Sequence, residues 1–435
     1  MSSGSTIIIT NNQNITFFSN PSITYFKSVY RKHTKFSITY KEESADTNFS
    51  ATKNEVSIEL NFDADLLCDI SLKVAVNSSE NNVYCRIPND ISLFLIQNIK
   101  LDMRGKLNDF DILSKDYINF QAMLDNPKLL NPNYSVDSSG EITCNNGNNY
   151  QNMALCGGVQ RKKNSDFALI KKMNANVPLP FSFSKSIGNA IPLCALDMRD
   201  IKPTIVITST SADTSNPENK FFITNSSGEI KEDTIDQDND TLRRLFKYST
   251  ITKYVFLSDD EKNRFLNTKL EYLYERVDLL NNDSDIFFTN NTQTSNNINI
   301  NNLNNNVSIK KIYLYNKLND DYNKLKYKIF INNQPLFTEF FNHEFFSKVE
   351  MLNKYKGCIY NGSNTGNISI DNNIAMIDFS LKESEGPSGS ISSITNTVNL
   401  KIKKTGDDET YNIKIFLCSY YLLTINNGEI RYVFN

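Results

Sequence analysis

Apolar and polar residues alternate with a period of two over many short stretches of the chain. From Val56 to Phe62 every second residue is apolar, and the residues between them are polar. Such alternation predicts a half-buried strand with one side facing solvent. Further strands are predicted by similar runs at residues 69–76, 92–101, 204–208, 250–257, 309–314, 326–332, 375–381, 398–402 and 411–425.

Helical patterns are few and short. Ser258 is followed three residues later by Glu261, which is the spacing of a capping box, in which each side chain bonds the other's backbone N–H. The pattern predicts a helix directly after the apolar strand that ends at Leu257, and with it a domain junction. A second short helix is expected over residues 115–124, and one of its faces would be formed by Tyr117, Phe120, Gln121 and Leu124.

The segments between the predicted strands are rich in Asn, Gly, Ser and Pro, as turns and surface loops usually are. Many strands, long loops and few helices are typical of antiparallel β-sandwiches. A chain of 435 residues is long enough for two such cores. We therefore expect two sandwiches, with the polar segments 133–152, 213–241 and 281–306 on the outer surface.

The net charge and the hydropathy of the chain argue against two classes of function, nucleic acid binding and membrane spanning. The 46 Lys and Arg residues are balanced by 49 acidic residues, so the net charge is −3. A chain without a basic excess is not expected to bind a nucleic acid backbone directly. No stretch approaches the roughly 20 apolar residues of a membrane-spanning helix, and residues 1–10 lack the pattern of a signal peptide. Synthesis in a cytosol-like compartment is expected.

Residues that could carry catalysis or bind metal are sparse. The seven cysteines form no C-x-x-C pair and are expected to be free thiols. Cys156 precedes two glycines and is expected in a loop, because no base for a thiol nucleophile is identifiable. His33 and His343 are expected to pack or to form hydrogen bonds. We expect no catalytic, cofactor-binding or metal-binding residue, and no cofactor.

Residues 20–36 read NPSITYFKSVYRKHTKF. This segment resembles the opening signature of the major capsid proteins of nucleocytoplasmic large DNA viruses. The usual form of that signature ends in Arg-Arg-His-Thr-Asn-Phe, and this chain has Arg-Lys-His-Thr-Lys-Phe instead. Further blocks match in the family's order, and they lie at residues 177–184 with 191–196, 254–265 with 271–273, 377–389 and 412–421.

The resemblance implies an all-β fold of two tandem eight-stranded antiparallel jelly-roll β-sandwiches with few short helices. It implies an N-terminal arm at residues 1–22, a first jelly roll at 23–257, a linker helix at 258–268 and a second jelly roll at 269–435. Pro178, Pro180 and Pro192 would mark strand ends at the base of the first barrel, or ordinary turns. Residues 386–389 would form a stiff turn. The aromatic residues Tyr25, Phe26, Tyr30 and Phe36 could have either of two roles. They would be anchors of a subunit interface, or they would pack in the core of the first barrel.

The function that the resemblance implies is structural and not enzymatic. The chain would be a major capsid protein whose homotrimeric, pseudo-hexameric capsomer tiles the icosahedral outer shell of a large double-stranded DNA virus. Its partners would be itself as a homotrimer, neighbouring capsomers, minor capsid proteins and an internal membrane beneath the shell, with no direct nucleic acid contact. It would reside in the virion capsid after assembly in the host cytoplasm. The alternatives are a minor capsid paralogue and a glycan-binding attachment module on the virion surface.

Overall fold

A computed structural model of the chain divides into two compact units, Met1–Lys35 and Phe36–Asn435. The two barrels described below lie in the second unit. The structure describes residue 26 and residues 32–50, 53–60, 64–77, 84–86, 90–104, 107–125, 133–145, 147–156, 167–169, 171–197, 201–209, 221–224, 230–233, 246–280, 286–288, 295–300, 308–316, 324–351, 353, 360–362, 368–370, 374–381, 387–405 and 411–433.

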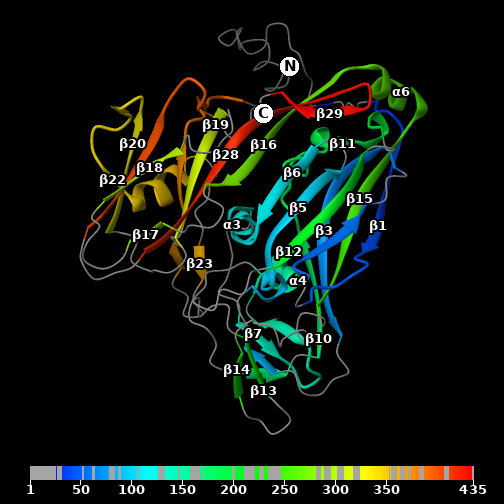
Figure 1. Cartoon of the computed structure of the whole chain (residues 1–435), viewed down its shortest axis with the longest axis horizontal. Coiled ribbons are helices and arrows are strands. Elements are labelled where there is room, and N and C mark those ends of the chain that lie inside the picture. Colours follow the sequence, from blue (N-terminus) through cyan, green and yellow to red (C-terminus); the bar gives the residue numbers. More distant parts are fainter. Residues whose placement is uncertain are drawn as a thin grey trace, which may run out of the picture. The chain divides into compact units, whose positions relative to one another are not determined.

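Two antiparallel sheets form the first barrel (Figure 1). Their strand orders are β1-β15-β3-β10 and β2-β12-β5-β6. Counted along the chain, these strands follow the orders 1-8-3-6 and 2-7-4-5, so the first strand pairs with the last, as in a jelly roll. The strands are β1 (Phe36–Ser44), β2 (Glu55–Glu59), β3 (Leu66–Asn77), β5 (Ile96–Arg104), β6 (Leu107–Ser114), β10 (Lys172–Pro178), β12 (Lys202–Ser209) and β15 (Phe246–Leu257).

The second barrel repeats this topology with other residues. Its sheets have the orders β16-β28-β19-β25 and β18-β27-β20-β21, which are again 1-8-3-6 and 2-7-4-5 along the chain. The expected double jelly roll is thereby confirmed. The strands are β16 (Leu270–Leu279), β18 (Ser295–Asn299), β19 (Ser308–Asn316), β20 (Leu325–Ile331), β21 (Gln334–Pro335), β25 (Ile374–Asp378), β27 (Val398–Lys404) and β28 (Tyr411–Asn426).

Shorter elements connect or extend these sheets. The short strands are β4 (Tyr84–Arg86), β7 (Asn133–Val136), β8 (Ile142–Asn145), β9 (Phe167–Leu169), β11 (Ile191–Pro192), β13 (Phe221–Thr224), β14 (Ile230–Asp233), β17 (Ile286–Phe288), β22 (Phe341–Asn342), β23 (Tyr360–Gly362), β24 (Ile368–Ile370), β26 (Ile391–Ser392) and β29 (Glu429–Tyr432). The helices are α3 (Lys115–Asp125), α4 (Asn149–Ala154), α6 (Asp259–Asn267), the 3₁₀ turns η2 (Ile91–Leu93), η3 (Ile187–Asn189) and η4 (Leu193–Ala195), and the π-helix η8 (Phe345–Glu350).

The alternating runs form strands because one face of each can be buried. In β2, Val56 and Ile58 point into the core, as does Leu60 directly after the strand, while Phe62 lies outside the described residues. The strand predicted at 92–101 begins only at Ile96, because residues 91–93 form the 3₁₀ turn η2. Each of the other predicted runs overlaps a strand of the two barrels.

Two of the segments expected to be exposed also contain buried residues, so their expected outer position stays a prediction. In residues 281–306, strand β18 pairs with β27, and the neighbouring Ile300 is buried. In residues 133–152, Ile142 and Gln151 are buried. Pairing satisfies the backbone of these polar stretches, so that their few apolar side chains can face the core. The segment 213–241 contains the hairpin β13–β14, and its outer position stays a prediction.

The helix predicted after Leu257 is α6, but its capping box was wrong. The Ser258 side chain forms no capping hydrogen bond, and the Ser258 carbonyl accepts the Glu261 amide at 3.0 Å instead. A tertiary contact supports the start of the helix. The buried Asp65 accepts the Leu257 amide at 2.9 Å and pairs with Lys262 Nζ at 2.7 Å. The hydrogen bond from Lys262 raises the pKa of that lysine.

The hairpin β28–β29 turns through the two residues Asn427 and Gly428. Their φ angles are 51° and 81°, which is the left-handed conformation that a type I′ turn requires and that Asn-Gly favours. The Gly428 carbonyl accepts the Asp197 amide of the first barrel at 3.1 Å. The turn thus contacts the other barrel as well as reversing the chain.

Replacing Gly428 with alanine is expected to lower the free energy of unfolding by about 1–3 kcal/mol. The new Cβ would lie 3.1 Å from the Asp197 Cβ, on a backbone with positive φ. Gly188→Ala is the matched control, because the nearest atom to its added Cβ is the Ser186 Oγ at 3.8 Å. Urea unfolding followed by circular dichroism measures both, and equal effects would contradict the strain argument.

Candidate functional site

The junction between the two barrels is the most elaborate polar and aromatic site that the structure describes. The first barrel contributes β6 and α3, and the second contributes β16, β28, β29 and part of β19 (Figure 1). Helix α3 forms as predicted and presents Phe120 to the second barrel. The Phe120 ring lies 4.7 Å from that of Tyr313 and stacks on Phe416 at 5.8 Å. Apolar burial therefore joins the barrels at α3.

A second aromatic cluster surrounds Phe110 of β6. Its ring lies 6.0 Å from that of Tyr274 and 5.8 Å from that of Tyr432. The Tyr432 hydroxyl donates to the Phe110 carbonyl at 2.8 Å, and the Tyr274 hydroxyl donates to the Asn189 carbonyl at 3.0 Å. Both hydroxyls come from the second barrel and bond the backbone of the first, so these contacts fix orientation as well as burying area.

Buried charges lie beside this cluster. Arg276 Nε donates to Asp278 at 2.7 Å, and its guanidinium also reaches the Asp109 and Phe110 carbonyls at 3.4 Å. Asp111 of the first barrel accepts the Ser182 amide at 2.7 Å. Burial raises the pKa of Asp111, and the charge of Arg276 partly offsets this. The positive charge of Arg276 thus stabilises the carboxylates of Asp278 in the second barrel and of Asp111 in the first.

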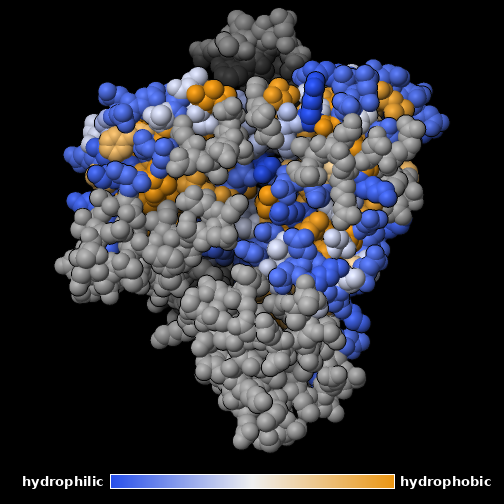
Figure 2. Space-filling view, viewed as in Figure 1, coloured by the Kyte–Doolittle hydropathy of each residue, from blue (hydrophilic) through white to orange (hydrophobic). Residues whose placement is uncertain are grey.

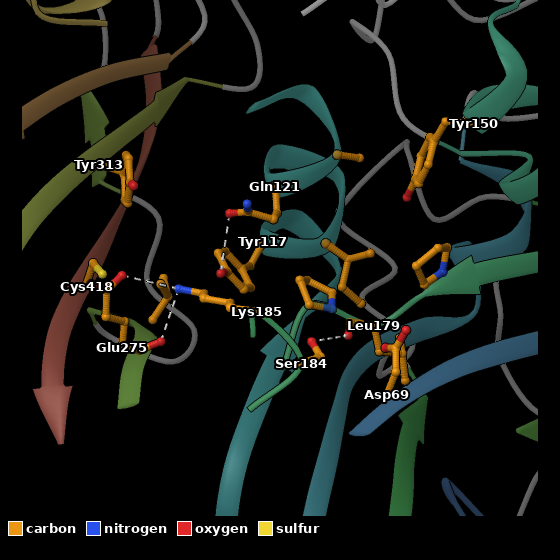
Figure 3. A pocket seen from close by; sticks show the side chains of 15 residues that line it. Asp69, Tyr117, Gln121, Tyr150, Leu179, Ser184, Lys185, Glu275, Tyr313 and Cys418 are labelled. Atoms are coloured by element: carbon orange, nitrogen blue, oxygen red, sulfur yellow. Dashed lines mark hydrogen bonds and ion pairs between the residues drawn. The ribbon is translucent and has the colours of Figure 1, made fainter. Parts of the chain in front are cut away.

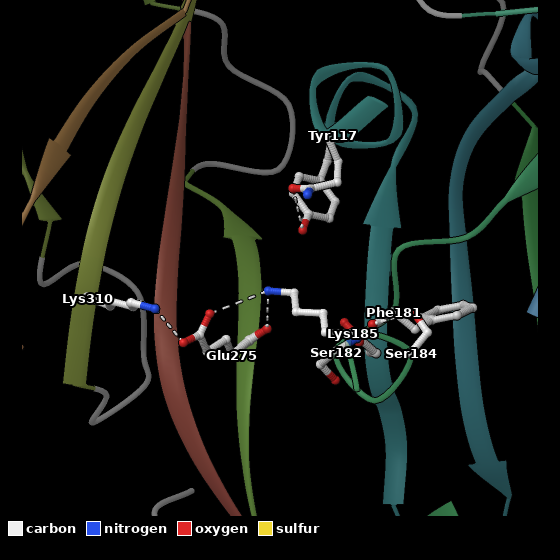
Figure 4. Close-up of polar contacts among 9 residues, drawn as sticks. Tyr117, Phe181, Ser182, Ser184, Lys185, Glu275 and Lys310 are labelled. Atoms are coloured by element: carbon white, nitrogen blue, oxygen red, sulfur yellow. Dashed lines mark hydrogen bonds and ion pairs between the residues drawn. The ribbon is translucent and has the colours of Figure 1, made fainter. Parts of the chain in front are cut away.

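A cleft of about 450 Å³ opens between the barrels next to α3 (Figure 3). Tyr117 and Gln121 line it from α3, and Lys185 extends across it to the second barrel. Lys185 Nζ donates to the Glu275 carbonyl at 3.2 Å and lies 3.7 Å from its carboxylate (Figure 4). The fully buried Lys310 pairs with the other Glu275 oxygen at 2.5 Å.

Glu275 is the acceptor that both lysines share. Burial raises its pKa, but the charges of Lys185 and Lys310 outweigh burial and hold the pKa below its usual value. A carboxylate held ionised between two ammonium groups is a poor general acid or base. The arrangement crosslinks the barrels electrostatically.

The two histidines do not lie together. His343 is buried, and its Nδ1 is 2.7 Å from the Tyr327 hydroxyl, so the expectation that it packs is confirmed. His33 is exposed and bonds the Thr34 carbonyl at 2.8 Å through Nδ1. Among the residues that the structure describes, no cluster of His, Cys, Asp or Glu has the size of a metal site.

The expected turn prolines lie where strands end. Pro178 is the last residue of β10, and Pro192 belongs to the two-residue strand β11. Phe36 is half-exposed at the start of β1, so it does not belong to the barrel core. Phe26 is exposed in the N-terminal unit, and Tyr25 and Tyr30 lie outside the described residues. The core role proposed for these aromatics was therefore wrong for Phe36.

Cys156 follows helix α4 and is completely buried. Burial raises the pKa of its thiol to about 12. Only the thiolate reacts readily with alkylating reagents. In folded protein at about pH 8, iodoacetamide should leave Cys156 unmodified, and it should modify that residue in urea. Peptide mass spectrometry measures both, and rapid modification in the folded chain would contradict the buried placement.

Sequence reasoning located the α3 residues of this junction but missed its charged residues. Glu275, Arg276 and Asp278 stand in a run with tyrosines and leucines that forms β16. Charged residues within an otherwise apolar strand were the available signal, but they do not say which barrel they would meet. Within the described parts of the chain, no helix is both long enough and apolar enough to cross a membrane.

Comparisons with known proteins agree with the fold. The family model of the major capsid protein N-terminus matches residues 24–258, which is 235 of 435 residues. The PBCV-1 VP54 structure, fitted into a reconstruction of the virophage Sputnik, is 18% identical with a TM-score of 0.63, over 95% of this chain and 100% of that one. The Faustovirus major capsid protein is 10% identical with a TM-score of 0.58, over 93% of each chain. No curated protein matches the chain. The chain therefore belongs to the major capsid protein family, whose members are structural components of the virion capsid, and it has the double jelly-roll fold.

Proposed function

We propose that this chain forms a homotrimeric, pseudo-hexameric capsomer that tiles the icosahedral outer shell of a large double-stranded DNA virus. Three copies would place six jelly rolls around one axis, related by a closed threefold operation. Its role is assembly, and we propose that it has no enzymatic activity.

The observation that carries this proposal is the repeated topology in one chain. Both barrels have the strand orders 1-8-3-6 and 2-7-4-5, so each can present similar surfaces to its neighbours. The junction holds them together through Phe120, Arg276 and Glu275, each of which contacts residues of the other barrel. Two similar and firmly joined modules per subunit are what a pseudo-hexamer built from three chains requires.

We propose an N-terminal arm at residues 1–22, jelly rolls at 23–257 and 269–435, and a linker helix at 258–268. Neighbouring capsomers, minor capsid proteins and an internal membrane would be the partners, with assembly in the host cytoplasm. The net charge of −3 favours no direct role in binding the genome.

The mass of the purified full-length protein in solution tests the capsomer. Light scattering at several concentrations should give the mass of three chains, and this mass should persist on dilution, as expected for an obligate oligomer. A monomer at every concentration would overturn the homotrimer.

A further inference from the structure

Strand β1 has an unusual distribution of apolar residues. Thr39 pairs with the buried Tyr254, and Glu43 accepts the Tyr254 hydroxyl at 3.2 Å, so the inward face of β1 is polar. Its outward face carries Phe36, Ile38 and Tyr40, which are 55%, 47% and 67% exposed. A strand that turns its large apolar side chains away from its own core is expected to bury them against another surface.

The second barrel shows what covers the corresponding strand. Strand β16 is the first strand of its barrel and pairs with the last strand, as β1 does. Within the chain, β6 of the first barrel packs on β16, with Phe110 against Tyr274 and Arg276 bonded to the Asp109 carbonyl. Strand β6 is the fifth strand of its barrel. The junction is therefore a contact between a fifth strand and a first strand.

The fifth strand of the second barrel is β21, and in the unit Phe36–Asn435 it has no such contact with the first barrel among the described elements. Next to it lies a groove of about 470 Å³, lined by residues 339–342, 344, 345, 348 and 349. Val349, which lines this groove, is 45% exposed, and so is Leu336, which directly follows β21. Figure 2 shows apolar side chains at the surface near β18 and β22, and Figure 1 shows β22 and β1 on opposite sides of the two-barrel unit.

We propose that the groove beside β21 of one copy receives the outward face of β1 of the next copy, which repeats between chains the contact that joins the barrels within a chain. This inference rests on the proposed capsomer and assigns its subunit interface. The two surfaces differ, so the contact is heterologous and three copies can close a ring. The side chains of Phe36, Ile38 and Tyr40 enter the groove.

Charged side chains lie around both surfaces. Lys253 stands beside Tyr40 on the outward face of the first barrel. Glu339 and Glu344 line the groove, and Lys348 pairs with Glu344. Two further cations, Lys328 and Lys403, lie over the Phe340 ring that lines the groove, so the groove carries charges of both signs. Opposite charges at the rim of an apolar contact favour one register over others.

Three single substitutions test the interface. Ile38→Asp changes the β1 face, Val349→Asp changes the groove, and Ile187→Asp is the control, since Ile187 is 64% exposed outside both surfaces. Burying a new carboxylate should weaken the contact by roughly 30-fold or more. Light scattering should give three chains for the unchanged protein and the control, and one chain for the other two variants.

The outcomes distinguish failure of the assigned interface from failure of the proposed homotrimer. If the unchanged protein is a trimer and either surface variant remains one, the assigned interface is overturned while the capsomer stands. A monomeric unchanged protein overturns both. Circular dichroism confirms that each variant is folded. If an aspartate variant does not fold, Tyr40→Ser and Leu336→Ser replace the pair, because both side chains are largely exposed and their loss creates no buried charge.

Discussion

Replacing Arg276 with alanine should lower the free energy of unfolding by about 3–5 kcal/mol, the usual cost of removing one partner of a buried ion pair. Arg276 bonds Asp278 at 2.7 Å and two carbonyls of the first barrel at 3.4 Å. Its charge also lowers the pKa of the buried Asp111. The substitution leaves both carboxylates without that cation, and the Asp109 and Phe110 carbonyls without that donor.

The decrease in the free energy of unfolding caused by Arg276→Ala should depend on pH. The pKa of Asp111 is already raised by burial, and loss of Arg276 would raise it further. A carboxyl group with a higher pKa in the folded chain than in the unfolded chain takes up a proton on folding. Its penalty is absent below the unfolded pKa and grows as the pH rises toward the folded pKa. The deficit of the variant should therefore be larger at about pH 8 than at about pH 5.

Urea unfolding of Arg276→Ala at these two pH values measures both effects. Lys73→Ala is the control, because its pair with Glu42 is largely solvent-exposed, with side-chain exposures of 28% and 47%. An exposed pair contributes only about 0–1 kcal/mol. A deficit for Arg276→Ala as small as that of the control would show that the junction charges are solvated.

Much of the fold could be predicted because it depends on local pattern. Alternation located β2 at Val56 and Ile58, and the apolar run before Ser258 located the end of β15. Both features depend only on the residues of one strand and on the core of the barrel to which that strand belongs. Strand β1 was not predicted, although its residues alternate between apolar and polar from Phe36 to Lys41. Such alternation indicates a strand but does not say that the apolar side chains lie on the outer face.

The junction could not be predicted in the same way. Asp111 and Arg276 are 165 residues apart, and each lies in a strand whose own pattern is ordinary. Their proximity follows from the packing of one barrel on the other, which no local pattern encodes. The capping box failed for a related reason. A long-range partner, Asp65, supports the start of α6 where a local serine contact was expected.

The second large effect is expected at Phe120, whose replacement by alanine should cost about 3–5 kcal/mol of unfolding free energy. The side chain is completely buried and stacks on Phe416 while its edge meets Tyr313. Because these partners belong to the second barrel, the cavity would form between the barrels and enlarge the adjoining cleft. Phe120→Leu retains part of the volume and should cost less.

Phe49→Ala separates loss of the junction from loss of packing in general. Phe49 is equally buried, but its aromatic partner is Tyr248 within the first barrel, at 5.2 Å. Both alanine variants should unfold at lower urea concentration. Hydrogen exchange should distinguish them, because Phe120→Ala should speed exchange in α3 and in the facing part of β28, whereas Phe49→Ala should leave β28 protected. Unchanged exchange at β28 in Phe120→Ala would mean that the charged and hydroxyl contacts hold the barrels together without this aromatic stack.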